Sequence, residues 1–124
     1  MHPRLALSLL AGLAVIAGTA ACSDDDNNNP PAGDVSITSG AASKTTTAFS
    51  PNPYTRSLAS SSGGEVTWVN VDGTVHDLED DTGLWDSGDM STNETFSFTF
   101  TAPGTYTYHC SIHPGMVGTI QIDP

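Results

Sequence analysis

The stretch "ETFSFTFTAPGTYTYHC", residues 94–110, predicts two successive β-strands joined by a turn. In its first half, three phenylalanines alternate with serine and threonine, as expected for a strand with one buried and one exposed face. In its second half, two tyrosines and Cys110 share one face. The segment "APG" at 102–104 is a turn signal, so we expect a tight antiparallel connection between the two strands.

Other runs rich in β-branched and aromatic residues predict further strands on both sides of this stretch. The clearest are Glu65–Asn70 and Gly118–Ile122, and weaker ones lie at Asp34–Thr38, Tyr54–Leu58 and Val75–Glu79. No capped segment of helical period follows residue 21. The sequence therefore predicts one all-β domain over residues 34–124, a sandwich or barrel of about seven to eight strands.

The first 21 residues have the pattern of a secretory signal peptide, with Arg4, an apolar run from Leu9 to Ala17, and small residues before Cys22. The alternative, a short amphipathic or core helix, is disfavoured because the run has no polar face. Residues 18–22 resemble a bacterial lipoprotein signal, whose cysteine becomes the lipidated first residue, although that family usually has Leu where Thr19 stands. We expect export to a bacterial periplasm or cell envelope, with membrane attachment through lipidated Cys22.

Residues 22–33 form a polar, low-complexity run that predicts a disordered tether, or simply a frayed terminus. The formal net charge of the chain is −11. Nucleic-acid binding needs clustered Lys and Arg, so this charge argues against it. With Cys22 lipidated, Cys110 has no internal disulfide partner, and its thiol is free, intermolecular or metal-bound.

The segment "YHCSIHPGM", residues 108–116, contains the spacing C-x2-H-x2-M formed by Cys110, His113 and Met116. A tight bend at Pro114–Gly115 allows the thiolate, the imidazole and the thioether to converge on one point. Sulfur ligands with imidazole favour copper over hard cations, and two His, one Cys and a distant axial Met describe a blue-copper electron-transfer site. The sequence therefore predicts a copper ion at this loop.

Such a site needs a second imidazole, and the mature chain offers His76 and His109. Adjacent residues of a strand point to opposite faces, so His109 does not share a site with Cys110. We therefore predict His76 as the fourth ligand and place His109 on the outer surface.

Two segments resemble the small blue-copper proteins, the cupredoxins of the plastocyanin, pseudoazurin and amicyanin group. The pattern W-x-N-x-D-x3-H, which carries the first ligand histidine in that family, matches residues 68–76. The pattern Y-x-C-x2-H-P-x-M matches residues 108–116, and the similarity extends over residues 49–122. The resemblance implies a Greek-key β-sandwich, one type 1 copper ion per chain, and one-electron transfer between redox partners.

In that family the imidazole corresponding to His113 reaches the surface through an apolar patch, and residues Pro114–Val117 are small or apolar enough to form one. Asp77 departs from the family, in which a neutral residue usually follows the first ligand. Our hypothesis is that its charge stabilises Cu(II) and lowers the reduction potential. Seven acids form either a negative rim for a basic partner or an ordinary solvated loop: Asp72, Asp77, Glu79, Asp80, Asp81, Asp86 and Asp89.

We expect a monomeric electron carrier, not an enzyme, whose redox partners are a c-type cytochrome or a copper enzyme of the envelope. The alternative is a protein of copper delivery or storage, but such carriers usually expose the metal among several Met or His residues. A copper enzyme such as an oxidase or a nitrite reductase fragment needs a second copper centre, for which only His109 is left.

Overall fold

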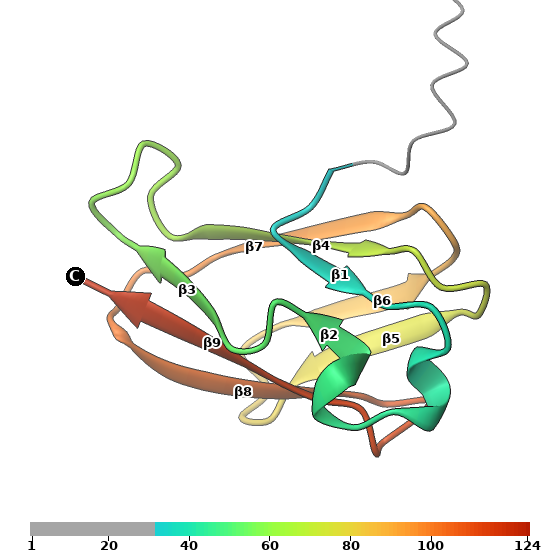
Figure 1. Ribbon diagram of the computed structural model, residues 1–124. Coiled ribbons are helices and arrows are strands. Elements are labelled where there is room, and N and C mark those ends of the chain that lie inside the picture. Colours follow the sequence, from blue (N-terminus) through green and yellow to red (C-terminus); the bar gives the residue numbers. More distant parts are fainter. Residues whose placement is uncertain (1–31) are drawn as a thin grey trace, which may run out of the picture.

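The computed structural model describes residues 32–124, which form two stacked β-sheets (Figure 1). The expected signal peptide at 1–21, Cys22 and most of the expected tether at 22–33 lie outside the described residues. Within the described part, no helix is long and apolar enough to cross a membrane.

Nine strands and two short 3-10 helices make up this part of the chain. In chain order they are β1 (Val35–Ile37), η1 (Ala41–Ser43), η2 (Thr46–Ala48), β2 (Phe49–Ser50), β3 (Tyr54–Ser57), β4 (Glu65–Asn70), β5 (His76–Asp80), β6 (Asp86–Met90), β7 (Thr95–Thr99), β8 (Gly104–Cys110) and β9 (Val117–Asp123). One sheet has the order β2-β1-β4-β7 and the other β3-β9-β8-β5-β6. The prediction of an all-β Greek-key sandwich is confirmed.

The structure contains two strands more than the seven segments that the sequence predicts. One is β2, which has only two residues and pairs with β1. The other is β6, whose sequence "DSGDM" consists mainly of turn formers. It is nevertheless a strand because it pairs antiparallel with β5 as the outermost strand of its sheet. Pairing with a neighbour therefore overrides local propensity here.

The connection between β7 and β8 is short, but the two strands do not form a hairpin as the turn signal at 102–104 suggested. β7 pairs with β4 in one sheet, whereas β8 pairs with β5 and β9 in the other. The turn therefore crosses from one sheet to the other. A turn signal fixes where a strand ends but not which strand the next one joins, and the apolar faces of both strands need the space between the sheets.

The core between the sheets is rich in aromatic side chains. The rings of Trp68, Trp85 and Tyr108 lie with centroids 4.8 to 5.6 Å apart, and all three residues are buried. Tyr108 faces Gly118 on the neighbouring strand, and a Cβ atom at Gly118 would lie 2.2 Å from the Tyr108 Cζ atom. Glycine is required at this position because the tyrosine ring occupies the space of a side chain.

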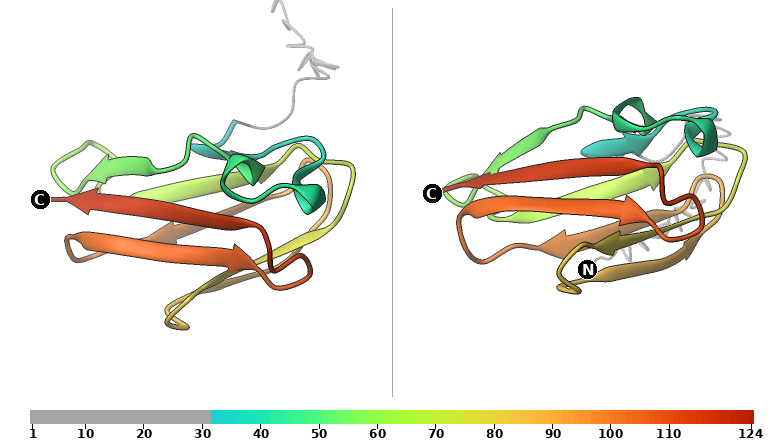
Figure 2. Two further views of the ribbon diagram at one scale, coloured as in Figure 1. Left: turned by 60° about the horizontal axis from the view of Figure 1, so that its bottom comes forward. Right: turned by 90° about the horizontal axis from the view of Figure 1, so that it is seen from below.

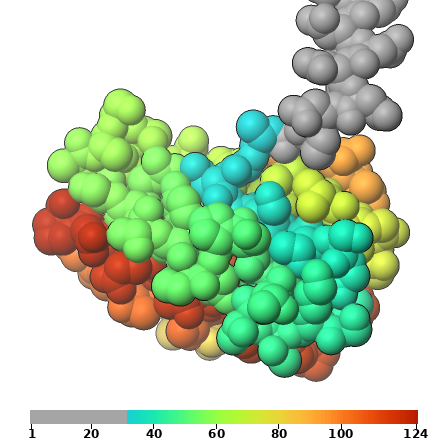
Figure 3. Space-filling model, viewed as in Figure 1, coloured from blue at the N-terminus to red at the C-terminus, as the bar shows by residue number. Residues whose placement is uncertain are grey.

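One end of the sandwich carries the loops that matter for function. The loop between β8 and β9 lies at the end away from the C-terminus, beside η1 and η2 (Figure 2). The segment that includes β2 and β3 covers much of the face seen in Figure 3. A hydrogen bond of 2.9 Å from the Gly40 N–H to the Asp72 carboxylate joins the start of η1 to the loop between β4 and β5.

Candidate metal centre

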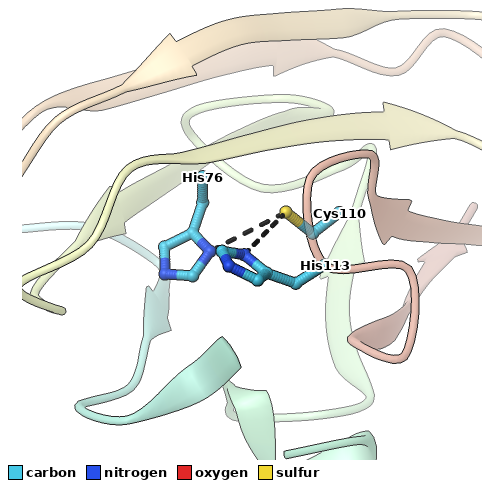
Figure 4. Close-up of side chains that lie close together, drawn as sticks. All are labelled: His76, Cys110 and His113. Carbon is cyan, nitrogen blue, oxygen red and sulfur yellow. Dashed lines mark hydrogen bonds between the residues drawn. The ribbon is translucent and has the colours of Figure 1, made fainter. Parts of the chain in front are cut away.

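Two neighbouring strands bring His76 and Cys110 to the same side of their sheet. His76 is the first residue of β5, Cys110 is the last residue of β8, and Cys110 pairs with Leu78. Residues two apart in a strand share a face, so His76 and Cys110 both point into the sandwich. Each is 0% exposed. His113 comes from the loop after β8 and points toward the same sulfur (Figure 4).

These three residues, called the donor cluster below, have spacings that fit a metal ion. The Cys110 Sγ atom lies 3.7 Å from Nδ1 of His76 and 3.9 Å from Nδ1 of His113. Bonds of about 2.3 Å to sulfur and about 2.0 Å to nitrogen, the lengths known for zinc, give a sulfur–nitrogen distance of about 3.7 Å at a trigonal ion. The donor set of one thiolate and two imidazoles is that of a blue-copper site. The donor cluster therefore fits copper in both geometry and chemistry.

Backbone hydrogen bonds close the loop that carries the remaining predicted ligand. The Cys110 N–H donates to the Met116 carbonyl oxygen at 3.2 Å, and the Met116 N–H donates to that of His113 at 3.0 Å. Met116 is 0% exposed and belongs to the core cluster that also contains Cys110. These bonds hold the backbone of Met116 next to the backbones of Cys110 and His113, the other two residues of the spacing C-x2-H-x2-M.

Asp72 holds the other side of the His76 ring. Its Oδ2 atom lies 2.8 Å from Nε2 of His76, and its Oδ1 atom accepts the N–H groups of Gly40 and Gly73, each at 2.9 Å. Burial by itself raises the pKa of Asp72, but these hydrogen bonds and the His76 imidazole outweigh it and hold the pKa below its usual value. The sequence analysis missed this contact, because Asp72 lies in the loop between β4 and β5, where sequence spacing does not determine which side chains meet.

Asp77 links the first-ligand strand to the cysteine loop. Its carbonyl oxygen accepts the Ser111 N–H at 2.7 Å, and its Oδ2 atom accepts the Ser111 hydroxyl at 3.0 Å. Burial raises the pKa of Asp77; the Ser111 hydrogen bond opposes this, and the neighbouring carboxylates of Asp86 and Glu79 add to it. Asp77 therefore joins the two segments that carry the donor cluster.

His109 lies outside the donor cluster, as expected from its place beside Cys110. Its Nδ1 atom is 2.7 Å from the Asp81 carboxylate, and its Nε2 atom is 3.7 Å from that of Glu79. Glu79 is also its partner across the strands β5 and β8. His109 is thus a half-buried cross-strand histidine on the outer face of the sheet.

The negative rim has fewer members than the sequence suggested. Asp72 and Asp80 are buried, at 6% and 4% exposure. Asp80 instead accepts the backbone N–H groups of Thr82 and Leu84. The acids that reach solvent are Asp77, Glu79, Asp81, Asp86 and Asp89. Including Asp72 and Asp80 was wrong, because both turn inward to bind groups of nearby loops.

The expected apolar patch also has a different composition. Met116 is fully buried and contributes nothing to the surface, whereas Val117 is 41% exposed. Ile112, which the sequence analysis did not include, is 48% exposed. Ile112 directly precedes the half-buried His113, and Val117 follows it by four residues. Exposed apolar residues therefore occur on both sides of His113 in the sequence, and they include Ile112 but not Met116.

Curated proteins similar to this chain include two amicyanins. The chain is 35% identical to amicyanin-alpha of Methylorubrum extorquens over 66 residues, which are 49% of this chain and 56% of that protein. It is 33% identical to amicyanin of Paracoccus denitrificans over 66 residues, 49% of this chain and 50% of that protein. The chain spans about half the length of these curated relatives.

Solved structures share the same architecture. A purple cupredoxin from Nitrosopumilus maritimus has a TM-score of 0.64 and 26% identity, covering 74% of this chain and 100% of that one. A copper-containing nitrite reductase from Thermus scotoductus has a TM-score of 0.57 and 25% identity, covering 73% of this chain but 22% of that one. The family described as copper binding proteins, plastocyanin/azurin family, matches residues 35–123. By its fold, its donor cluster and this match, the chain belongs to the plastocyanin/azurin family of copper-binding proteins.

Proposed function

We propose that this protein carries single electrons between redox partners through one type 1 copper ion held by His76, Cys110, His113 and Met116. The observation that supports this most directly is the spacing of the donor cluster, 3.7 and 3.9 Å from sulfur to the two nitrogens. Bound copper supplies a one-electron Cu(II)/Cu(I) couple at this site. The protein holds the ligands and controls access to them.

The burial of the donor cluster suits an electron carrier. His76 and Cys110 are fully buried and keep water from the site, while His113 is half-buried. The exposed side chains of Ile112 and Val117, which precede and follow His113 in the sequence, offer a partner an apolar contact that needs no desolvation of charge. We propose that electrons enter and leave through the His113 ring.

The acidic surface defines the chemistry of the partner. The five solvent-reaching acids lie on β5, which begins with His76, directly after β5, and on its neighbour β6. A basic partner, such as a c-type cytochrome or a copper enzyme, would be steered toward this surface.

We propose that the protein acts as a monomer. We also propose that it is anchored in the bacterial envelope through Cys22, which the signal pattern of residues 1–22 supports.

Delivery or storage of copper is the rival function, and copper release separates the two. A delivery protein exposes its metal to the acceptor, whereas two of the three residues in the donor cluster are 0% exposed. Catalysis would need a second centre, and His109 is bound to Asp81 on the opposite face. We therefore propose a carrier that is not an enzyme and that retains its copper.

Addition of Cu(II) to the purified protein tests the proposal. We expect an intense thiolate-to-copper absorption band and narrow copper hyperfine splitting in the EPR spectrum, both lost in Cys110→Ser. The matched control is Ser111→Ala, which alters the neighbouring loop residue but leaves the donor cluster intact. A spectrum without the band, or rapid transfer of copper to a chelator, would contradict electron transfer and favour delivery.

A further inference from the structure

A buried carboxylate lies directly behind the first proposed copper ligand. Asp72 is 6% exposed, and its Oδ2 atom is 2.8 Å from Nε2 of His76, which is itself 0% exposed. The other oxygen accepts two backbone N–H groups, from Gly40 and Gly73. No other charged side chain among the described residues lies within salt-bridge distance of His76.

This contact determines which nitrogen of His76 carries the proton. A carboxylate accepts hydrogen bonds, so Nε2 donates its proton to Asp72 and Nδ1 keeps its lone pair. Nδ1 is the atom that lies 3.7 Å from the Cys110 sulfur. The free lone pair therefore faces the point where the donor cluster converges, which is what a metal ligand requires.

We propose that Asp72 is a positioning residue that fixes the tautomer and orientation of His76 and, through its negative charge, favours Cu(II) over Cu(I). This inference rests on the proposed copper site. A carboxylate hydrogen-bonded to the far nitrogen raises the electron density of the imidazole and strengthens its bond to the more highly charged ion. Asp72 thus lowers the reduction potential without touching the metal.

A purely structural role for Asp72 is the competing explanation. The hydrogen bond from Gly40 ties the loop between β4 and β5 to the residue that precedes η1, and the bond from Gly73 lies within that loop. Asn70 adds to this network, since its side-chain oxygen accepts the Asp72 N–H at 2.9 Å. Loss of these bonds would lower stability, but it would not by itself change the preference of the site for one oxidation state.

The variant Asp72→Asn separates the two explanations, because it keeps the shape and one acceptor oxygen but removes the charge. The matched control is Asp80→Asn. Asp80 is also buried, at 4% exposure, and its carboxylate binds Thr82 and Leu84 rather than a residue of the donor cluster. Both variants remove one buried charge from the same domain, so only contact with His76 distinguishes them.

The test measures reduction potentials of the copper-loaded wild type and both variants by redox titration of the blue band. We expect Asp72→Asn to lower the affinity for Cu(II) relative to Cu(I) about tenfold, the lower end of such effects. This corresponds to a rise of about 59 mV for one electron. We expect Asp80→Asn to change the potential by less than half of that. Equal shifts in the two variants would overturn the proposal.

A second measurement needs no variant and no copper. In the ¹⁵N-labelled, metal-free full chain, NMR should show the His76 ring protonated at Nε2 and unprotonated at Nδ1. A neutral His76 ring with its single proton on Nδ1 would overturn the inference even if Asp72→Asn fails to fold. Absence of the blue band in the copper-loaded wild type overturns the proposed function and this inference with it. A normal band with an unchanged potential in Asp72→Asn overturns the inference alone.

Discussion

The contact between Gly118 and Tyr108 gives a sharp test of how the two central strands β8 and β9 are packed. In Gly118→Ala, the new Cβ atom would lie 2.2 Å from Cζ, 2.5 Å from the hydroxyl oxygen and 2.6 Å from Cε1 of Tyr108. Carbon atoms in contact normally lie about 3.5 Å or more apart, so the ring must move by about 1.3 Å. We expect this single methyl group to be strongly destabilising.

The surroundings of the Tyr108 ring determine the magnitude. Ring centroids of Phe49, Trp68 and Trp85 lie 4.8, 5.6 and 5.6 Å from that of Tyr108, so these three rings resist its displacement away from Gly118. Overpacking a core typically costs about 1–3 kcal/mol, and a rigid site belongs at the upper end. We therefore expect a loss of about 3 kcal/mol in the free energy of unfolding. For a domain of this size, that lowers Tm by about 12–24 °C.

Urea unfolding followed by tryptophan fluorescence measures the loss. The control is Gly73→Ala, whose Cβ atom would meet nothing within 4 Å, and which should change stability by less than about 0.5 kcal/mol. Gly118→Ala made in a Tyr108→Leu background should cost less than about 1 kcal/mol, because the obstructing ring is gone. A loss below about 1 kcal/mol in the wild-type background, or the same loss in both backgrounds, would refute the packing argument.

Two further predictions concern acidic residues near the site. Asp77→Asn removes a negative charge beside His76 and should raise the reduction potential of the copper-loaded protein, measured by redox titration; an unchanged potential would contradict the hypothesis. For Asp81, a hydrogen bond from Thr107 and then contact with His109 hold the pKa of the carboxyl below its ordinary value of 3.8, against the effect of burial. The folded state therefore binds this proton less readily, and the resulting stability is present above that value and lost as pH falls through the lowered pKa. Asp81→Asn should cost roughly 0.5 kcal/mol at pH 6, since exposed pairs contribute little, and progressively less as the pH falls through the lowered pKa. If urea unfolding gives the same cost at every pH, the charge of Asp81 is not the source of its contribution to stability.

Strand positions were predictable where side-chain alternation is strong, and this explains which elements sequence analysis located. The strand β4 begins and ends at the predicted residues Glu65 and Asn70, and its first four residues alternate between solvent-reaching and buried. The strand β6 was not predicted because "DSGDM" carries no apolar alternation, and its conformation comes from pairing with β5. Pairing of this kind depends on residues distant in the sequence and leaves no local signal.

The donor cluster was predictable for a different reason. Cys110 and His113 lie in one short loop, so their spacing constrains their geometry, and His76 followed from the opposite orientation of His109. No local spacing of this kind predicts that Asp72 is buried. Its carboxylate is buried because it also accepts the N–H of Gly40, a residue 32 positions away. An acid in an Asp-rich segment is expected at the surface, and only the tertiary contact reverses that expectation.

The way in which the donor cluster is held bears on the choice between a carrier and a delivery protein. Backbone and side-chain bonds between Asp77 and Ser111 fasten the His76 strand to the loop of Cys110, and a bond from Cys110 to Met116 closes that loop. These bonds all lie within the protein, so they set the distances between the donor atoms without help from a metal. A site held in this way changes little when the charge of its ion changes by one, which favours rapid electron transfer. Release of an ion requires ligands to move apart, and the same bonds oppose that motion. Ser111→Ala removes the side-chain bond to Asp77 and keeps the backbone bonds. It should therefore speed copper release while leaving the blue band in place, and equal release rates would show that the side-chain bond does not help to retain the metal.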